Sequence, residues 1–432
     1  MKLLLLAFAF CAALFSCNPV QEEISLSFSP SSLTLNYPVD KQLTLMVNGK
    51  AYDMENNPLG VEYSSNNTSV AVVSSTGMLS TVGAGFARIS AVCGESSADF
   101  SVFVEGVSYD ITINYSQKLT QEMIYSNNNA LLDNKSMQSF DVLLDGDIVF
   151  GGQTINSLEF QRIKPNGSSV EAMYAFYAGH GTNFSVEEPP AGGDQYLWIS
   201  NFASKITELD YKNEQLISGI KFEPGKQYMP EDCDNYYFGD YSYVLAAVDS
   251  EHDLLALNGG GRDFKIFRLS EAVKAPKKSI TLRPIKRGGP SGGPITVEET
   301  VTLTVSAHDL TSIPTVASFT LPSDAIIQGT SSVDGKTRAE QGFCVYKDRL
   351  YFLSGPDIAI AIVDFNGKVI QSAKALAIDD DPEDYLPLGV SRNGYLEPEG
   401  IKIRRGKVYV GVIWPFLGES TSSWRSTIIK LN

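Results

Sequence analysis

Polar residues stand directly before five apolar, strand-like stretches in the carboxyl-terminal part of the chain. Because the five stretches resemble one another, the residues that enter them are expected to occupy equivalent places in the fold. A carboxylate, an imidazole and amides that meet at one place can bind a polar ligand or exchange protons with it. These entry residues are Gln138, His180 to Asn183, Tyr241, Gln341 and Glu399.

His180 and Glu399 form the pair with the widest range of possible chemistry. His180 is one of only three histidines in the chain, and an imidazole titrates near neutral pH. Together with Glu399 it can form an acid/base pair or a cation site. A Gly-His-Gly corner can equally serve to hydrogen-bond neighbouring sheets. The residue types alone leave both alternatives open.

Three further motifs do not predict a specific chemistry. Residues 379–384 are strongly acidic but lack the glycine and the spacing of an EF-hand loop, so Ca²⁺ binding is not supported. His308-Asp309 has no defined serine partner for a catalytic triad. Residues 259–262, Gly-Gly-Gly-Arg, lack the Lys-Ser/Thr ending of a P-loop and predict a turn.

An internal repeat indicates the elements that position the entry residues. Each repeat has an alternating apolar stretch, a short polar turn and a second stretch rich in aromatic and β-branched residues, with starts about 65 residues apart. Five such units predict a five-bladed β-propeller over residues 107–432, in which the entries to the innermost strands meet at one mouth of the central channel. Gln138, His180, Asn183, Tyr241, Gln341 and Glu399 are therefore expected to form a ligand-binding site. The five units are 139–150, 182–200, 241–257, 341–352 and 399–410.

Two segments lie outside this repeat. Residues 109–114 alternate apolar with polar side chains, and we expect them to supply a strand that closes the ring with the last blade. Residues 274–294 are basic in an otherwise acidic chain. They are expected to form a solvated, flexible excursion, with contact to an acidic partner or to lipid as the alternative.

Residues 24–106 carry short alternating strands at intervals of about ten residues, which predict a β-sandwich. The order of landmarks from residue 61 to residue 104 resembles the bacterial immunoglobulin-like domains of group 2. Tyr63 stands where that family usually has Trp and still supplies a large aromatic core residue. The resemblance implies a spacer or adhesive module without a catalytic role.

A second resemblance concerns the repeats. The segments Gly179 to Asn183, Tyr196 to Trp198, Gln341-Gly342 and Glu397 to Ile401 resemble helveticin-like propellers, a group that includes proteins labelled teichoic acid biosynthesis protein C. The resemblance implies a five-bladed propeller at a bacterial or phage surface. This chain departs from helveticins in two features, a lipobox-like segment at Leu14 to Cys17 and the immunoglobulin-like spacer. Both argue against bacteriocin action.

The amino terminus predicts export and lipid attachment. Residues 1–16 have one positive charge and an apolar run that is too short to cross a bilayer, which is typical of a secretion signal. Leu14 to Cys17 resembles the lipobox of bacterial lipoproteins, so Cys17 is the expected site of lipid attachment; an ordinary cleaved signal is the alternative. Residues 17–23 would form a tether. Its acidic part resembles the export tag of some Bacteroidetes lipoproteins, which favours surface display on the outer membrane over a periplasmic orientation.

Composition limits the function further. The formal net charge is −16 and Cys93, Cys233 and Cys344 form no metal-ligand spacing, so neither nucleic acid, a cofactor nor a metal is expected. The sequence predicts an all-β, lipid-anchored surface protein whose propeller binds a glycan or a protein. The alternative is an enzyme that acts on carbohydrate or on sulfate or phosphate esters, with His180 as acid/base and Glu399 as its partner or as a cation ligand.

Overall fold

In a computed structural model of the chain, the described residues are almost entirely β-strand. Among them the single α-helix, α1 (Leu269–Ala272), has four residues, and no helix is long and apolar enough to cross a membrane. The predicted signal peptide, Cys17 and the acidic run 379–384 lie outside the described residues. The described residues are 24–36, 39–56, 58–68, 70–82, 85–105, 111, 113–116, 123–127, 137–153, 157–164, 170–188, 194–205, 211–212, 214–287, 299–325, 327, 329–330, 337–376, 397–415 and 424–431.

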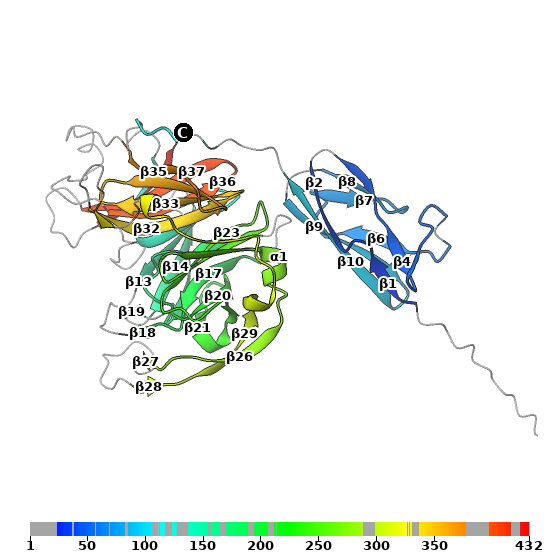
Figure 1. The fold of residues 1–432 in the computed structure, drawn as a ribbon, viewed down its shortest axis with the longest axis horizontal. Helices are drawn as coiled ribbons and strands as arrows, with labels where there is room; N and C mark the ends of the chain where they lie inside the picture. The colour runs from blue at the N-terminus through cyan, green and yellow to red at the C-terminus, as the bar shows by residue number, and fades with distance from the viewer. Residues whose placement is uncertain are drawn as a thin grey trace, which may run out of the picture.

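The amino-terminal part is a β-sandwich that lies to one side of the larger carboxyl-terminal part (Figure 1). Its longest strands, β9 (Gly85–Cys93) and β10 (Ser96–Glu105), pair antiparallel. In β9 the small and apolar residues Ala87, Ile89 and Ala91 are fully buried, and the residues between them are partly exposed. This period of two is what one buried sheet face requires. The other strands of the sandwich are β1 (Leu26–Phe28), β2 (Ser32–Asn36), β3 (Asp40–Gln42), β4 (Leu45–Val47), β5 (Lys50–Ala51), β6 (Glu62–Ser65), β7 (Ala71–Val73) and β8 (Met78–Thr81).

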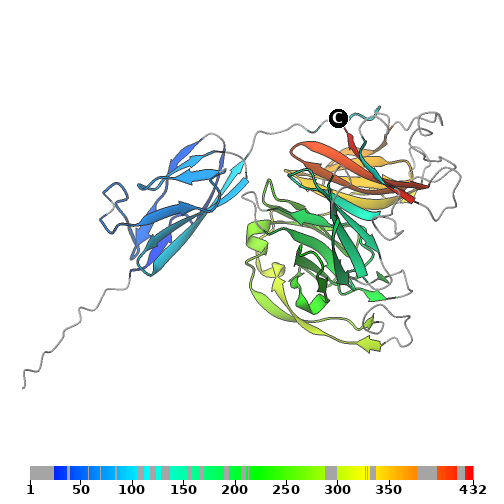
Figure 2. The same ribbon diagram turned by 180° about the vertical axis from the view of Figure 1, so that it is seen from behind.

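Within the described residues, five sheets surround one axis and form the blades of a propeller (Figures 1 and 2). The predicted all-β class, with a sandwich followed by a five-bladed propeller, is confirmed. We number the blades along the chain by their innermost strands. These are β12 (Met137–Val142), β16 (Ser185–Glu187), β23 (Val244–Asp249), β32 (Thr337–Tyr346) and β36 (Glu397–Arg404) for blades 1 to 5.

The remaining strands extend each blade outward in the order of hydrogen bonding. Blade 1 continues with β13 (Ile148–Gln153), β14 (Ser157–Ile163), β15 (Val170–Phe176) and β21 (Gln227–Tyr228). Blade 2 continues with β17 (Tyr196–Asn201), β20 (Leu216–Lys221) and β22 (Asp234–Tyr237). Blade 3 continues with β24 (Leu254–Gly259), β25 (Asp263–Arg268) and β30 (Ala317–Thr320). Blade 4 continues with β33 (Arg349–Gly355), β34 (Ala359–Asp364) and β35 (Val369–Ala375), and β31 (Gly329–Thr330) pairs with its inner strand. Blade 5 continues with β37 (Lys407–Pro415), β38 (Trp424–Leu431) and β11 (Met123–Asn127).

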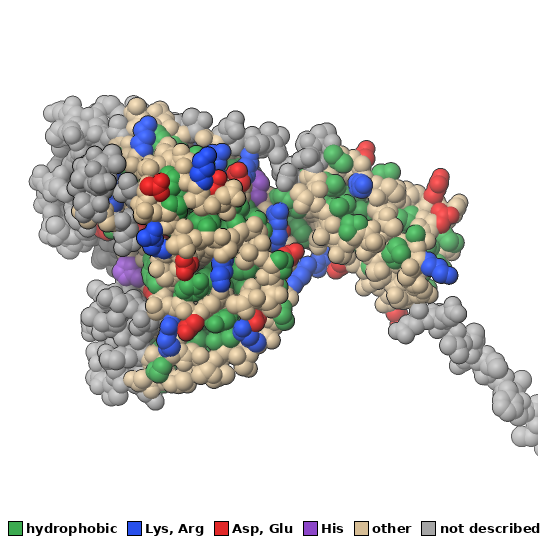
Figure 3. Space-filling model, in the orientation of Figure 1, with side chains coloured by type: hydrophobic (Ala, Val, Ile, Leu, Met, Phe, Trp, Pro, Cys, Tyr) green, Lys and Arg blue, Asp and Glu red, His purple; other side chains and the backbone are tan. Residues whose placement is uncertain are grey.

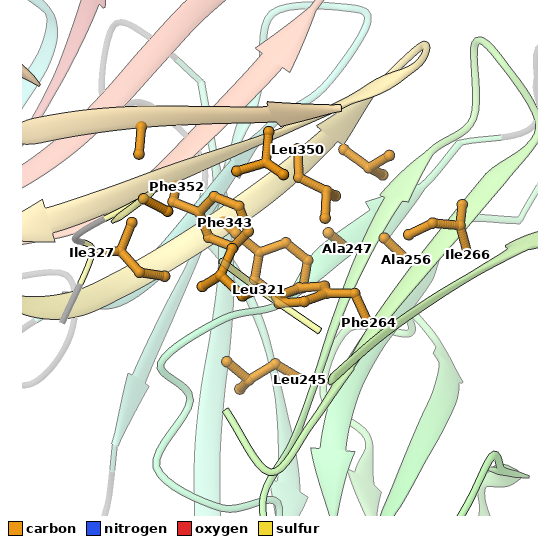
Figure 4. Close-up of a cluster of buried hydrophobic side chains, with 14 of the residues drawn as sticks. Leu245, Ala247, Ala256, Phe264, Ile266, Leu321, Ile327, Phe343, Leu350 and Phe352 are labelled. Atoms are coloured by element: carbon orange, nitrogen blue, oxygen red, sulfur yellow. The ribbon is translucent and has the colours of Figure 1, made fainter. Parts of the chain in front are cut away.

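A cluster of buried apolar side chains fills each contact between neighbouring blades. Figure 4 shows the cluster between blades 3 and 4, where Phe264 of β25 lies against Phe343 and Phe352. The ring centroids of Phe264 and Phe343 are 5.3 Å apart and the rings meet edge to face, a preferred geometry for aromatic pairs. Phe140, Phe184, Phe343 and Ile401, each on or next to an inner strand, are all fully buried in these clusters.

The strand that closes the ring was predicted in the wrong place. β11 (Met123–Asn127) pairs antiparallel with β38, so the closing strand begins 14 residues later than the expected segment 109–114. Ile111, Ile113 and Tyr115 instead pack as partly buried side chains against the cluster between blades 4 and 5. Alternation of apolar residues occurs in both cases, because a segment that covers a core needs an apolar face whether or not it pairs as a strand.

The basic segment is an ordered ribbon in its described part, which corrects the expected flexible excursion. β26 (Lys277–Thr281) pairs with β29 (Thr304–Asp309), and β29 lies parallel to β22, so the ribbon extends blade 2 (Figure 1). Beyond it, β27 (Ile285–Arg287) pairs with β28 (Glu299–Val301). Lys277 Nζ lies 2.8 Å from Asp234 and Lys278 Nζ lies 2.6 Å from Asp309. These basic side chains therefore pair with acids of the same chain.

Candidate functional site

Three of the five inner strands contain a β-bulge at a predicted site residue. The pairing register shifts at Gln138 in β12, at Gln341 in β32 and at Glu399 with Gly400 in β36. A bulge inserts an extra residue and changes the direction of its side chain. The bulges therefore explain how residues of these otherwise apolar strands come to face the channel.

Glycine follows two of these bulged residues for a steric reason. Gly342 and Gly400 have φ angles of 125° and 126°, where a side chain is strained. A Cβ atom on Gly342 would also lie 3.0 Å from Asn183 Oδ1. The Gln-Gly and Glu-Gly pairs of the sequence thus mark the places where inner strands approach each other closely.

Five residues, each two positions before a buried apolar residue of its repeat, line one cavity. The cavity measures about 430 Å³, within the size range of small-molecule binding sites. Thr182 and Tyr243 occupy in blades 2 and 3 the place that Gln138, Gln341 and Glu399 occupy in the other blades. The complete lining is Gln138, His180, Thr182, Tyr243, Ala339, Glu340, Gln341, Glu397, Glu399 and Ile413.

His180 reaches the cavity from a corner built by glycines. Gly179 and Gly181 have φ angles of 75° and 86°. A Cβ on Gly181 would lie 2.7 Å from Leu158 Cδ2, so this position has no room for a larger residue. The corner places His180 on the same cavity as Glu399, as their positions in the repeats predicted.

Asn183 is placed differently from the expectation. It is 1% exposed and does not line the cavity. Its Nδ2 donates to the carbonyl of Ala246 at 2.7 Å, and its Oδ1 accepts from the backbone N–H of Phe343 at 3.3 Å. Asn183 therefore connects blade 2 with blades 3 and 4, because a buried amide needs partners and the neighbouring inner strands supply them.

Tyr241 is also placed differently. Its ring packs on Phe238 with centroids 5.1 Å apart, and its carbonyl accepts a hydrogen bond from Arg283 of the ribbon. Tyr243 lines the cavity in its place. A pattern with a period of two cannot distinguish Tyr241 from Tyr243, because both side chains point to the same face of an extended strand.

The cavity holds acidic residues that the sequence reasoning missed. Glu340 directly precedes Gln341, and Glu397 stands two residues before Glu399 in the Glu-Pro-Glu-Gly motif. Their closeness in sequence to predicted site residues could have indicated that they line the same cavity. Gln341 Nε2 donates to Glu397 Oε1 at 3.3 Å. The described lining contains three glutamates and neither lysine nor arginine.

Burial raises the pKa values of two of these carboxyl groups. Glu399 is 5% exposed, and its pKa lies well above its usual value, first because of desolvation and then because of the nearby Glu397. Desolvation alone raises the pKa of Glu340 to about 7. Both groups can therefore hold a proton in mildly acidic solution and release it when a cation approaches.

Further along the inner strands, buried charges close the centre of the ring. Arg404 of β36 lies 2.5 Å from Asp141 of β12, and it donates to the carbonyls of Val142, Val186 and Val248. One arginine thereby contacts blades 1, 2 and 3. Lys402 donates to the carbonyl of Phe184, and burial lowers its pKa to about 8.

The other motifs have structural places. His308 Nδ1 lies 2.6 Å from the carbonyl of Ala275, and its ring stacks on Tyr236. Gly260 and Gly261 form the turn between β24 and β25, as predicted. In the described part of the chain, no group of three His, Cys, Asp or Glu side chains is arranged to hold a metal ion. Cys93, Cys233 and Cys344 are free thiols.

The geometry defines a class of protein: an immunoglobulin-like sandwich joined to a five-bladed propeller with a polar channel mouth. Residues 25–103 match the family described as bacterial Ig-like domain (group 2). Residues 136–258 match the phage 5-bladed beta propeller receptor binding platform domain. The chain thus carries a group 2 Ig-like domain at its amino terminus and a phage-type five-bladed propeller domain behind it, as the two resemblances implied.

Comparison with whole proteins shows only distant likeness. No curated protein matches the chain. A Myxococcus xanthus glutaminyl cyclase has a TM-score of 0.35 and 10% identity, covering 72% of this chain and 95% of its own. A structural genomics protein of unknown function from Bacteroides thetaiotaomicron has a TM-score of 0.30 and 9% identity over 95% and 99%. A DUF4623 family protein from Bacteroides eggerthii has a TM-score of 0.27 and 10% identity over 92% of each chain. At these scores none supports a functional argument.

Proposed function

We propose that the propeller binds a glycan or a protein at its channel mouth, and that the immunoglobulin-like domain is its spacer or an additional adhesive module. An Ig-like domain and a receptor-binding propeller fit a binding or adhesion-type surface protein. One observation supports the proposed site above the others: a residue in or directly before the inner strand of each of the five blades lines a single polar cavity. Ligand sites commonly combine such a concave shape with a few convergent polar groups.

A glycan array probed with the full chain tests this function. We expect binding to one group of glycans, and loss of at least tenfold in affinity when Gln341→Ala removes a lining amide. Ser306→Ala, on the exposed surface of the ribbon, is the matched control. Absence of binding to glycans and to envelope proteins, or equal losses in both variants, would contradict the proposed site.

The anchor is part of the same proposal. We infer that Cys17 carries lipid and places the chain on the outer membrane, with its domains exposed on the cell surface. The lipobox-like Leu14 to Cys17 supports the anchor, and the acidic tether supports surface display. Cys17→Ala should transfer the protein from the membrane to the soluble fraction, and protease added to intact cells should cleave the unaltered chain. A periplasmic orientation would protect it.

The second candidate function is enzymatic. His180 and Glu399 line the same cavity, and the raised pKa of Glu399 is a property that acid catalysts share. The substrates would be glycosides or sulfate or phosphate esters, with His180 as acid/base. Incubation with chromogenic esters and glycosides tests this: turnover that is lost in His180→Ala favours an enzyme, whereas binding without turnover favours a binding module.

A further inference from the structure

The channel mouth is unusual in the charge of its lining. Three glutamates, Glu340, Glu397 and Glu399, line it together with neutral polar side chains, and no lysine or arginine occurs among its described lining residues. Buried acids elsewhere in the propeller have partners of their own. Asp141 pairs with Arg404, and Glu187 accepts a hydrogen bond from the indole of Trp198 at 2.7 Å. The mouth differs from these two places because no residue of its described lining is a lysine, an arginine or a tryptophan, and His180 is the one lining side chain that can become a cation.

The side chain of Glu399 and one carboxylate oxygen of Glu340 have no hydrogen-bond partner among the described residues. Glu399 is 5% exposed, and no hydrogen bond or ion pair from the described residues reaches its side chain. Glu340 Oε1 is buried without a hydrogen-bond partner. An unpaired buried polar group costs about 1–3 kcal/mol, and a charged one costs more. Since the fold retains two such groups at one cavity, a ligand that pairs with them would recover this cost.

The missing partner is expected to be a hydrogen-bonding cation. The described residues offer no group of three ligands for a metal ion. An ammonium group needs no such coordination sphere, because it donates three hydrogen bonds and is stabilised by carboxylates and amide oxygens. The amide of Gln138 and the hydroxyl of Thr182 line the same cavity and suit the hydroxyl groups of a sugar.

The net charge of the molecule also favours a cationic ligand. The chain carries −16 in total, which attracts cationic ligands over long range. On the face shown in Figure 3, acidic and basic side chains are interspersed over the described surface. The channel mouth has three carboxyl groups and, among its described lining residues, His180 as the one basic side chain, so an approaching cation can ionise these carboxyl groups and pair with them.

We infer that the channel mouth recognises a protonated primary amine, of the kind that an unacetylated amino sugar carries, through Glu399 in the cavity that Glu340 also lines. The inference rests on the proposed binding function and specifies its ligand class. In this arrangement the ammonium group lies against Glu399, and the amides of Gln138 and Gln341 contact the sugar hydroxyls.

Calorimetry with a matched pair of oligosaccharides tests the inference. The full chain is titrated near neutral pH with a glucosamine tetramer and with its fully N-acetylated counterpart, which has the same backbone without the ammonium groups. We expect binding of the amine form and at least tenfold weaker binding of the acetylated form. Glu399→Gln keeps the size of the side chain and removes its charge, so it should weaken the amine form at least tenfold and leave the acetylated form unchanged.

Controls separate folding from recognition. Glu399→Asp retains a carboxylate and should bind the amine form better than Glu399→Gln, and Glu62→Gln on the exposed face of the sandwich should have no effect. If Glu399→Gln fails to fold, as judged by its thermal unfolding, the difference between the two tetramers on the unaltered chain decides. Equal affinity for both tetramers, absence of binding to the amine form, or an unchanged affinity in a folded Glu399→Gln variant would overturn the inference. A neutral glycan whose binding is lost in Gln341→Ala but kept in Glu399→Gln would retain the proposed function and reject the amine.

Discussion

Asp141 and Arg404 form an ion pair at the centre of the ring that is almost completely removed from water. The side chain of Asp141 is 0% exposed and that of Arg404 is 9% exposed. Asp141 also accepts hydrogen bonds from the backbone N–H groups of Val142 and Val186, each at 2.8 Å. Loss of one partner leaves the other charge buried without compensation, which is costly.

We therefore expect Asp141→Ala to destabilise the propeller by about 3–5 kcal/mol. Denaturant unfolding followed by tryptophan fluorescence measures the change. The matched control is Asp194→Ala in the propeller, which removes an ion pair with Lys221 whose side chains are 55% and 38% exposed. Exposed pairs contribute about 0–1 kcal/mol, so similar losses in the two variants would contradict a central role for Asp141.

Glu340 is expected to make the stability of the propeller depend on pH. Its pKa in the folded protein is about 7, against a usual 4.5, so the folded state binds more protons than the unfolded state between these values. The free energy of unfolding should then fall as pH rises from about 4.5 to 7, because a rise in pH disfavours the state that binds more protons, which here is the folded state.

Glu340→Gln removes this contribution. The variant should lose part of the fall in stability over that range, by at most about 3.5 kcal/mol, since each tenfold change in proton affinity corresponds to about 1.4 kcal/mol. Unfolding midpoints at pH 5 and pH 8 measure the difference, with the exposed Glu62→Gln as control. A Glu340→Gln variant with the same pH profile as the unaltered chain would disprove the assignment.

At the residue scale, the sequence predicted the position of a site residue better than its orientation. Gln138, Gln341 and Glu399 could be found because each stands two residues before a buried apolar residue of its repeat. Asn183 could not be recognised as a connection between blades, since its partners belong to strands about 60 and 160 residues away. Contacts at such separations leave no local pattern.

At the scale of elements, the bulge in β36 holds Glu399 in the cavity wall. Gly400 adopts a φ of 126°, and a Cβ there would lie 3.4 Å from Ser139 Oγ. Gly400→Ala should destabilise the propeller by about 1–3 kcal/mol, because it forces a side chain into a strained backbone conformation. Unfolding free energy and ligand affinity measured on the same variant test this.

Gly219→Ala in β20 provides the comparison for that variant. Gly219 has no positive φ, and the nearest atom to an added Cβ, Cε2 of Tyr236, lies at an ordinary contact distance of 3.5 Å. Its replacement should cost less than about 1 kcal/mol. If Gly219→Ala were the more harmful of the two, the bulge would have no special role.

The elements that sequence reasoning missed depend on distant pairing. The five inner hairpins were predictable because their strands are consecutive and alternate clearly. The ribbon was not, since β29 pairs in parallel with β22 about 70 residues earlier. Lys277 and Lys278 read as a solvated basic run in the sequence, and only the fold places Asp234 and Asp309 beside them.

At the scale of the whole molecule, the ring closes between segments from opposite ends of the propeller. β11 pairs with β38, and without it the edge of β38 would be open to other chains. A fragment of residues 107–432 should therefore be monomeric and stable, whereas a fragment of residues 137–432 should aggregate or unfold at lower temperature. Light scattering and thermal unfolding compare the two; equal behaviour would show that closure by β11 is dispensable.

The sandwich and the propeller have separate cores, and this separation predicts how the whole chain unfolds. The buried cluster of the sandwich contains only residues 28–104, and Phe86 and Arg88 of the sandwich line a cavity together with residues of the propeller. Phe103 lies 6.4 Å from His252 between ring centroids, and Arg268 lies 5.8 Å from the Phe103 ring. Two cores that share no buried residue should unfold independently.

Calorimetry of the full chain should accordingly show two transitions, and fragments 24–106 and 107–432 should each reproduce one of them. Phe103→Ala should leave both transition temperatures almost unchanged in the full chain, because the contact adds little to either core. A single cooperative transition in the full chain, which disappears when the chain is cut near residue 106, would contradict independent unfolding. It would mean that the sandwich is a structural part of the propeller, and that its function as a spacer requires another explanation.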